Sequence, residues 1–218
     1  MNINETYAVF GLGRYGRAVA VELLKSGAEV LAVDSDEALV RDAASEIPVC
    51  KCADITDPYV IEKLGIGSID VVVIAMASNL EASVMAITLC KEAGVKKVVA
   101  KCANEMHKKI YERVGADKVV FPENESGIRL AKNLISAGFI DIIDFSDDVS
   151  IIEADVKKEW IGKNLMELNF RKRYSVNVVS VIKDGQVIIA IDPEMPFEED
   201  MKLIVIGNTS KLNKVFND

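Results

Sequence analysis

The stretch GLGRYG, residues 11–16, decides the fold of this chain. It follows a short apolar run, Tyr7–Phe10, and opens a segment with helical spacing. In a strand–loop–helix unit, Gly11 permits a tight turn, Gly13 lets the backbone approach a pyrophosphate, and Gly16 lets the helix pack closely on the strand. Free N–H groups and the dipole at the helix start favour an anion there. The stretch therefore predicts a dinucleotide-type phosphate loop.

An acidic residue follows at the distance that this type of loop requires. Asp34 ends the second strand-like run, 18 residues after Gly16, and its carboxylate can accept hydrogen bonds from ribose hydroxyls. Because Ser35 rather than an arginine comes next, a 2′-phosphate is disfavoured. Arg14 is open to two interpretations, a solvated surface arginine or a guanidinium that clamps a phosphate. The second would suit ATP or ADP as well as NAD.

The first two thirds of the chain alternate between strand-like and helix-like periods. Val71–Ala75 has no polar alternation, which is typical of a strand buried on both faces of a parallel sheet. The pattern predicts an α/β fold, a Rossmann-like doubly wound parallel sheet of six strands followed by a small α+β C-terminal lobe. The six expected strands are Tyr7–Phe10, Glu29–Val33, Val49–Cys52, Val71–Ala75, Lys97–Ala100 and Lys118–Phe121.

The domain organisation follows from a change of pattern near residue 140. We expect a nucleotide-binding domain over residues 1–122, a crossover helix and linker over 123–144, and the C-terminal lobe over 145–218. In the lobe, the expected strands are residues 150–156, 176–182, 186–191 and 203–206. Asp184-Gly185 is a hairpin turn signal. Glu125–Ala137 is a plausible helix.

Composition excludes several classes of function. The formal net charge of −8 argues against a broad basic surface that binds nucleic acid. The longest apolar run, residues 71–77, is far shorter than the ~20 residues that span a bilayer. No signal peptide pattern is evident, so a cytoplasmic setting is expected. The four cysteines form no C-x-x-C pair, which disfavours a zinc site.

Catalytic machinery is not evident beside the loop. His107 is the only histidine, and there is no Ser/His/Asp order, metal triad or Walker lysine. A dehydrogenase would also need a substrate domain with a proton-transfer group. The sequence therefore favours a nucleotide sensor over an enzyme, with an NAD-dependent oxidoreductase as the alternative.

Further stretches carry a resemblance to a known family through their order and spacing. They are AVFGLGRYG 8–16, VLAVD 30–34, ADITD 53–57, VIAMASN 73–79, KCAN 101–104, GAD 115–117 and PE 122–123, and in the lobe IGKNL 161–165 with Leu168, YSVNVV 174–179 and DMKLIVIG 200–207. In these the chain resembles the regulatory subunits of Ktr and Trk potassium uptake systems, which are built from the RCK (KTN, TrkA-N plus TrkA-C) module. The similarity is greatest to the KtrA type.

The resemblance implies a function without chemistry. Such subunits form homodimers that assemble into octameric rings on the cytoplasmic face of a separate potassium-translocating membrane protein. Nucleotide in the Rossmann cleft changes the shape of the ring and so the activity of the transporter. A free-standing nucleotide or cyclic di-AMP sensor without a channel partner stays an alternative.

The resemblance also implies the nucleotide contacts. Gly11, Gly13 and Gly16 would form the phosphate loop, and Arg14 would reach a terminal phosphate, in part across the dimer interface. The residues expected at the ribose and adenine are Asp34, Ser35, Asp36, Asp54 and Ile55. Those expected to border the ribose and phosphates or to close the far side are Met76, Ala77, Ser78, Lys101, Cys102 and Ala103.

Two expectations have a plainer alternative. His107 falls where some members place a histidine near the nucleotide, and its alternative is a helix-surface role. Glu123 matches a glutamate at the dimer interface, where paired copies in some members hold a divalent cation beside ATP. Its alternative is an acid favoured by a helix start.

A second ligand site is implied in the C-terminal lobe. Several Ktr-type regulators bind cyclic di-AMP between paired lobes, and the matching positions are Arg171, Asn177, Val178 and Pro193. The alternative is that residues 171–173 are a solvated basic turn. Asp192 departs from the family pattern, because a carboxylate near a phosphate would weaken binding. The expected ligands are thus ATP or ADP first, then NAD(H), with cyclic di-AMP and a divalent cation as further possibilities.

Overall fold

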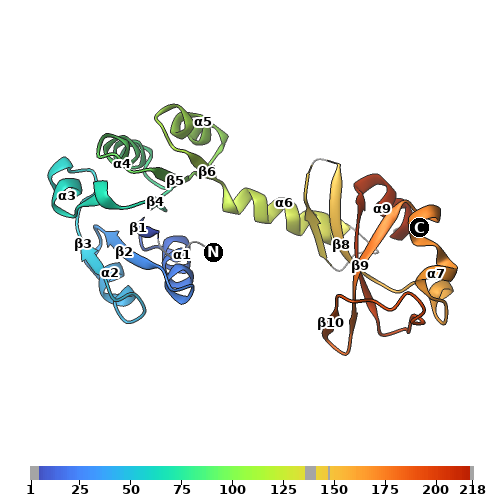
Figure 1. Cartoon of the computed structure of the whole chain (residues 1–218). Helices are drawn as coiled ribbons and strands as arrows, with labels where there is room; N and C mark the ends of the chain where they lie inside the picture. The colour runs from blue at the N-terminus through green and yellow to red at the C-terminus, as the bar shows by residue number, and fades with distance from the viewer. Residues whose placement is uncertain (1–4, 136–140, 147, 217–218) are drawn as a thin grey trace. The chain divides into compact units, whose positions relative to one another are not determined.

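The computed structural model describes residues 5–135, 141–146 and 148–216. It divides into two compact units, Met1–Glu123 and Asn124–Asp218 (Figure 1). Within the described residues, no helix is both long and apolar enough to cross a membrane. The crossover helix α6 (Pro122–Ile135) begins in the first unit and continues in the second. The expected domain boundaries, after residues 122 and 144, stay predictions.

The first unit is a six-stranded parallel sheet with the strand order β3-β2-β1-β4-β5-β6. The strands are β1 (Thr6–Phe10), β2 (Glu29–Asp34), β3 (Cys50–Cys52), β4 (Val71–Ile74), β5 (Lys97–Lys101) and β6 (Lys118–Val120). The helices are α1 (Arg14–Lys25), α2 (Glu37–Ala43), α3 (Pro58–Lys63), α4 (Leu80–Glu92) and α5 (Glu105–Arg113), with a 3₁₀ turn at Ile66–Ser68. This order confirms the predicted doubly wound, Rossmann-like sheet.

Burial on both faces of the sheet explains the apolar run of β4. All four residues of Val71–Ile74 are buried. Val72 and Ile74 belong to one core cluster, and Val73 joins Val9 in the cluster on the other side. Successive residues of a strand point to opposite faces, so helices on both sides require an unbroken apolar sequence.

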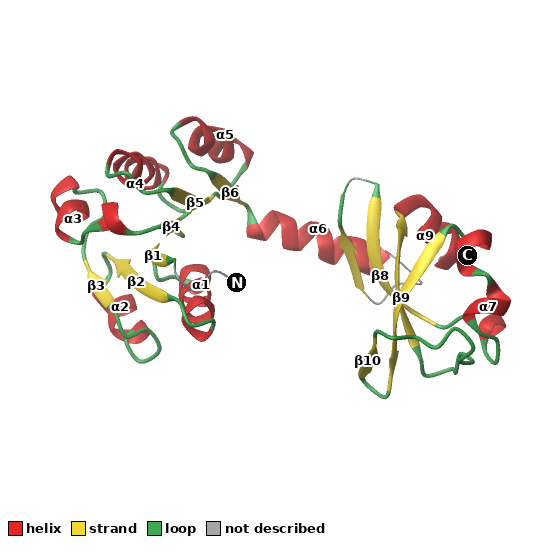
Figure 2. Ribbon diagram, viewed as in Figure 1, coloured by secondary structure: helices red, strands yellow, loops and turns green. Residues whose placement is uncertain are grey.

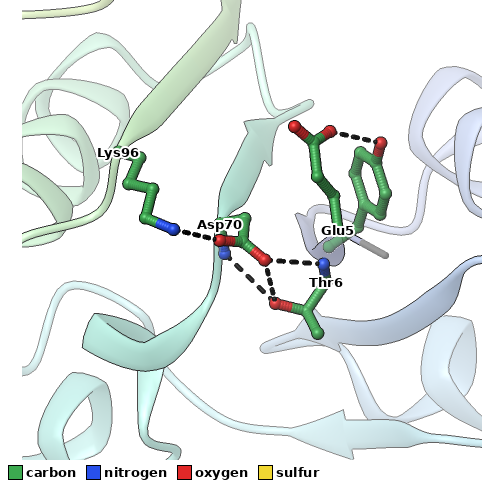
Figure 3. Close-up of polar contacts among 5 residues, drawn as sticks. Glu5, Thr6, Asp70 and Lys96 are labelled. Atoms are coloured by element: carbon green, nitrogen blue, oxygen red, sulfur yellow. Dashed lines mark hydrogen bonds and ion pairs between the residues drawn. The ribbon is translucent and has the colours of Figure 1, made fainter. Parts of the chain in front are cut away.

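A polar network joins the amino ends of β1, β4 and β5 (Figure 3). Asp70 accepts hydrogen bonds from Thr6 N (3.0 Å) and Thr6 Oγ1 (3.1 Å), and its other oxygen lies 2.7 Å from Lys96 Nζ. The Lys96 ammonium, and then the two Thr6 donors, lower the pKa of Asp70 from 3.8 to about 2. Asp70 therefore stays ionised and ties the strand ends together well into the acidic range.

Asp70→Asn is expected to lower the melting temperature near neutral pH. A carboxyl whose folded pKa is depressed stabilises the fold above its unfolded pKa, and that contribution is lost as pH falls through the folded pKa. The difference between wild type and variant should therefore shrink between pH 4 and about 2. Thermal melts at several pH values measure it. A difference that is independent of pH would contradict the electrostatic role of Asp70.

The second unit is a five-stranded antiparallel sheet with the order β10-β9-β11-β8-β7 (Figure 2). The strands are β7 (Asp141–Asp144), β8 (Val149–Asp155), β9 (Val176–Lys183), β10 (Gln186–Ile188) and β11 (Lys202–Asn208). Short helices are the 3₁₀ turn η2 (Lys158–Trp160), α7 (Leu165–Leu168), α8 (Phe170–Arg173) and α9 (Thr209–Phe216). This sheet and its helices confirm the small α+β lobe. Strand β7 and helix α9 were not predicted, and β10 ends earlier than expected.

An aromatic cluster fills the core of the lobe. Trp160 is 1% exposed, and its ring meets Phe170 and Phe216 edge-on, with ring centroids 4.8 and 5.4 Å away. Edge-to-face contacts of this kind favour one arrangement of the rings. The only tryptophan of the chain is thus a core residue of the lobe.

Candidate functional site

A cleft of about 600 Å³ opens at the carboxyl ends of the strands of the first unit. It lies where β1 and β4 are neighbours and the strand order reverses, the usual ligand position in such sheets. Its lining residues are Gly11, Gly13, Val33, Asp34, Ser35, Leu39, Ala53, Asp54, Ile55, Thr56, Ala75, Met76, Ala77, Ser78, Asn79, Ala82, Lys101 and Ala103.

Each glycine of the loop has a different reason to lack a side chain. Gly11 has φ +94°, and a Cβ there would lie 3.2 Å from Met76 N. A Cβ on Gly16 would lie 1.9 Å from the Gly11 oxygen, so the helix could not approach the strand. A Cβ on Gly13 would meet no atom within 4 Å. Gly11 and Gly16 therefore serve the fold, whereas Gly13 keeps space open at the cleft.

The start of α1 differs from the starts of its neighbours. Asp36, Asp57, Asn79 and Asn104 cap α2, α3, α4 and α5 through their side chains. Helix α1 has Gly13 at its N-cap and no side-chain cap hydrogen bond. Because its first N–H groups have no side-chain acceptor, a phosphate in the cleft can take that role.

Asp34 links the glycine loop to the end of β2. Its Oδ2 accepts a hydrogen bond from Leu12 N at 2.6 Å, and its Oδ1 accepts one from Asp36 N at 2.9 Å. A carboxylate oxygen has further acceptor capacity, so Asp34 can hold the loop and still receive ribose hydroxyls from the cleft.

A turn after β3 supplies another wall of the cleft. Asp54 accepts hydrogen bonds from both the hydroxyl and the backbone N–H of Thr56 at 2.7 and 2.9 Å. These bonds lower the pKa of the Asp54 carboxyl. Ile55 is 5% exposed and packs in the core cluster. The turn thus presents one fixed carboxylate beside an apolar surface, a suitable setting for the adenine ring of a nucleotide.

A buried hydroxyl holds the loop after β4. Ser83 Oγ lies 2.6 Å from the Met76 carbonyl and 2.9 Å from the Asn79 carbonyl, and the residue is fully buried. Asn79 itself caps α4 and lines the cleft. Sequence analysis missed Asn79 as a site residue, although an asparagine before an apolar helix is a recognisable cap signal.

A basic side chain, Lys101 at the end of β5, lines the cleft. Lys101 Nζ is 2.5 Å from Glu123 Oε1 and 5.2 Å from the centre of the Tyr15 ring, and the lysine side chain is only 13% exposed. Lys101, and more weakly Arg14, lower the pKa of Glu123. Lys101 is therefore a cation held at the cleft, already partnered by a carboxylate that an anionic ligand would have to share.

Eleven of the expected nucleotide contacts line the cleft and six do not. Those brought together are Gly11, Gly13, Asp34, Ser35, Asp54, Ile55, Met76, Ala77, Ser78, Lys101 and Ala103. Those absent from the lining are Arg14, Gly16, Asp36, Cys102, His107 and Glu123. Gly16 packs against the Gly11 oxygen, Asp36 caps α2, and Glu123 forms an ion pair with Lys101.

Cys102 and His107 are not among the residues that line the cleft. Cys102 is fully buried in the core cluster, and burial raises the pKa of its thiol. His107 lies on α5, and its Nδ1 is buried with no hydrogen-bond partner in the described chain. No group of three or more His, Cys, Asp or Glu side chains within the described residues could hold a metal ion.

A groove of about 400 Å³ in the second unit brings the other expected ligand residues together. Arg171, Asn177, Val178 and Pro193 all line it. Arg171 Nε donates a hydrogen bond of 2.7 Å to Asn177 Oδ1, which fixes the guanidinium at the groove. Asp192 is not among the lining residues, and its Oδ1 accepts from Glu194 N at 3.0 Å. The carboxylate expected to oppose a phosphate is thus engaged in a turn.

Comparison with known proteins identifies both units. Residues 7–122 match the TrkA-N domain and residues 149–218 match the TrkA-C domain. The chain is 32% identical over 213 residues to "Ktr system potassium uptake protein C" of Bacillus subtilis, covering 97% of this chain and 96% of that protein. It is 32% identical over 209 residues to "Ktr system potassium uptake protein A" of Vibrio alginolyticus, covering 96% and 95%.

Solved structures share the fold at low sequence identity. The structure titled "GsuK Channel" aligns with a TM-score of 0.71 at 16% identity, covering 98% of this chain and 39% of that one. The structure titled "Crystal Structure of the GsuK RCK domain" gives a TM-score of 0.69 at 17% identity, and the chain spans about half of its length, 48%. The fold of the chain is therefore that of RCK domains.

Proposed function

The chain belongs to the family of potassium uptake proteins built from TrkA-N and TrkA-C domains, and from this premise we propose that it is a nucleotide-sensing regulatory subunit of a potassium transporter. One observation carries the proposal. The uncapped start of α1, Gly13 and the Asp34 carboxylate meet in a cleft that offers donors to phosphates and acceptors to a ribose.

We propose ATP or ADP as the primary ligand. Lys101 lines the cleft and offers a cation to a terminal phosphate, and the resemblance adds Arg14, which lies outside the cleft lining. NAD(H) is the second choice, since the cleft also suits a dinucleotide. Structures with the same fold are titled "GsuK channel bound to NAD" and "Crystal structure of the GsuK bound to ADP", which supports nucleotides as a class.

The proposed role involves no chemical step. The relatives are named as potassium uptake proteins, and Lys101 and Asp34 are engaged in an ion pair and in loop contacts. A divalent cation is proposed only together with nucleotide, because a single Glu123 carboxylate paired with Lys101 is too small a donor set.

Helix α6 offers a surface for the proposed dimer. Its apolar residues Ile128, Leu130, Leu134 and Ile135 are 49%, 59%, 77% and 81% exposed. Exposed apolar side chains gathered on one helix mark interaction sites. We propose that α6 pairs with its copy, that dimers form the octameric ring, and that the ring docks on the cytoplasmic face of a potassium-translocating membrane subunit.

Titration calorimetry with ATP, ADP and NADH tests the ligand. Asp34→Ala is expected to weaken nucleotide binding about 10- to 100-fold, because it removes charge-assisted hydrogen bonds to the ribose and loosens the loop at Leu12. Asp57→Ala is the control, since Asp57 caps α3 and is not among the residues that line the cleft. Equal weakening by both variants, or no binding of any nucleotide by wild type, would overturn the proposal.

Three further experiments separate the alternatives. Cyclic di-AMP is proposed as a ligand of the groove at Arg171, and its binding should be lost in Arg171→Ala while ATP binding is retained. Reproducible turnover of NAD with small alcohols or acids would instead support the oxidoreductase. Copurification with a membrane potassium transporter distinguishes a subunit from a free-standing sensor.

A further inference from the structure

A basic groove in the second unit belongs to neither ligand site described above. It has a volume of about 500 Å³ and is lined by Lys157, Glu159, Trp160, Arg173, Tyr174, Ser175, Lys211, Lys214 and Val215. We call it the Trp160 groove. Its lining residues come from η2 and the residue before it, from the end of α8 and the two residues after it, and from α9, a helix that packs on β8 and β11.

The Trp160 groove is distinct from the groove at Arg171. The two share no lining residue. Arg171 and Arg173 are two positions apart on the short helix α8, a spacing that puts side chains on different faces. Arg171 is held by Asn177 at one groove, whereas Arg173 lines the other. The basic stretch 171–173 therefore serves two separate surfaces.

Positive charge gathers in this groove although the chain is acidic. The protein carries a formal net charge of −8, but the Trp160 groove has four basic side chains and one acidic residue, Glu159. In the described part of the chain, none of the four basic groups pairs with a carboxylate. Lys211 and Lys214 are three residues apart on α9, where like charges repel. An anion would relieve that repulsion.

Aromatic rings position two of the cations. Lys157 Nζ lies 5.8 Å from the centre of the Trp160 ring, and Arg173 Cζ lies 5.4 Å from that of Tyr174. Contacts at this distance attract a cation to the ring face. Trp160 Nε1 is a buried donor without a hydrogen-bond partner in the described residues. The groove thus combines cations held near aromatic rings with an apolar wall.

We infer that the Trp160 groove binds an anion that carries two or more negative charges on phosphate groups. A phosphate ester brings a charge of about −1.5 to −2 and three strong acceptor oxygens, and Arg and Lys side chains are the usual partners of phosphate. The anion is either a soluble phosphorylated compound or the headgroup of an anionic phospholipid. This inference does not depend on nucleotide binding in the first unit.

The single tryptophan makes the groove directly observable. Trp160 is the only tryptophan of the chain, so its fluorescence reports on this groove without a label. The full chain is titrated with pyrophosphate at constant ionic strength, balanced with potassium chloride. We expect a saturable change in emission, and an affinity at least about tenfold lower in the Lys211→Gln/Lys214→Gln variant.

Two control variants keep the result specific. Lys172→Gln removes a neighbouring positive charge that does not line the groove, and should leave the affinity unchanged. Gly13→Ala blocks the cleft of the first unit, and the response of Trp160 should persist in it. Melting temperatures of all variants check that each is folded.

Vesicles distinguish the source of the phosphate. Phosphatidylcholine vesicles with and without phosphatidic acid, whose headgroup is a phosphate monoester, are compared with pyrophosphate. A response to pyrophosphate identifies a soluble ligand, and a response confined to phosphatidic acid vesicles identifies a headgroup; both support the inference. It is overturned if neither probe gives a saturable change, or if Lys172→Gln weakens binding as much as the double variant does.

Discussion

Gly13→Ala is expected to weaken nucleotide binding at least about 100-fold while leaving the fold intact. The backbone of Gly13 has φ −61°, which alanine adopts without strain, and a Cβ there would meet no protein atom within 4 Å. The added methyl group would instead occupy the space through which a phosphate reaches the N–H groups of α1. Losing about two charge-assisted hydrogen bonds accounts for that factor. Titration calorimetry measures it.

Thermal melting provides the control for this substitution. The melting temperature of Gly13→Ala should match that of wild type, because the change creates no clash. Unchanged affinity in a folded variant would show that phosphates do not approach α1. A large loss of stability would show that Gly13 serves the fold instead.

Gly16→Ala is expected to prevent stable folding of the first unit. The new Cβ would lie 1.9 Å from the Gly11 oxygen and 2.9 Å from Ala75 Cβ, so α1 would have to move away from the sheet. Backbone atoms cannot yield as a flexible side chain does, and we expect a cost of at least about 3 kcal/mol. The melting temperature should fall by about 10 °C or more, or the protein should be insoluble.

Gly127→Ala is the matched control for a glycine within a helix. Gly127 lies in α6, and a Cβ there would meet nothing within 4 Å. Alanine is favoured over glycine inside a helix by roughly 0.5–1 kcal/mol, so this variant should be slightly more stable than wild type. Gly16→Ala melting at the wild-type temperature would contradict the close approach of α1 to the sheet.

Local sequence patterns predicted the first unit because its decisive features are local. The order of glycines at residues 11–16 imposes a strand, turn and helix, and Val71–Ile74 must be buried on both faces. The lobe was predicted less completely. Strand β7 (Asp141–Asp144) is short and carries an acid at each end, so it lacks the apolar alternation that marked the other strands.

The site was predicted in part for the same reason. Positions at or just after the carboxyl end of a strand, such as Asp34 and Met76, reach the cleft because the carboxyl ends of parallel strands share one edge. Cys102 also follows a strand, but it points into the core. Which way a side chain points after a strand depends on packing against the helices, and a linear pattern does not contain that information.

Potassium uptake by cells of the native host tests the central claim most directly. Cells that lack this chain are supplied with wild type or with Gly13→Ala, and uptake is measured at low external potassium. The account predicts that deletion lowers uptake, that wild type restores it, and that the folded Gly13→Ala protein does not. Full restoration by Gly13→Ala, or uptake unaffected by the deletion, would contradict a regulatory subunit that acts through nucleotide in this cleft.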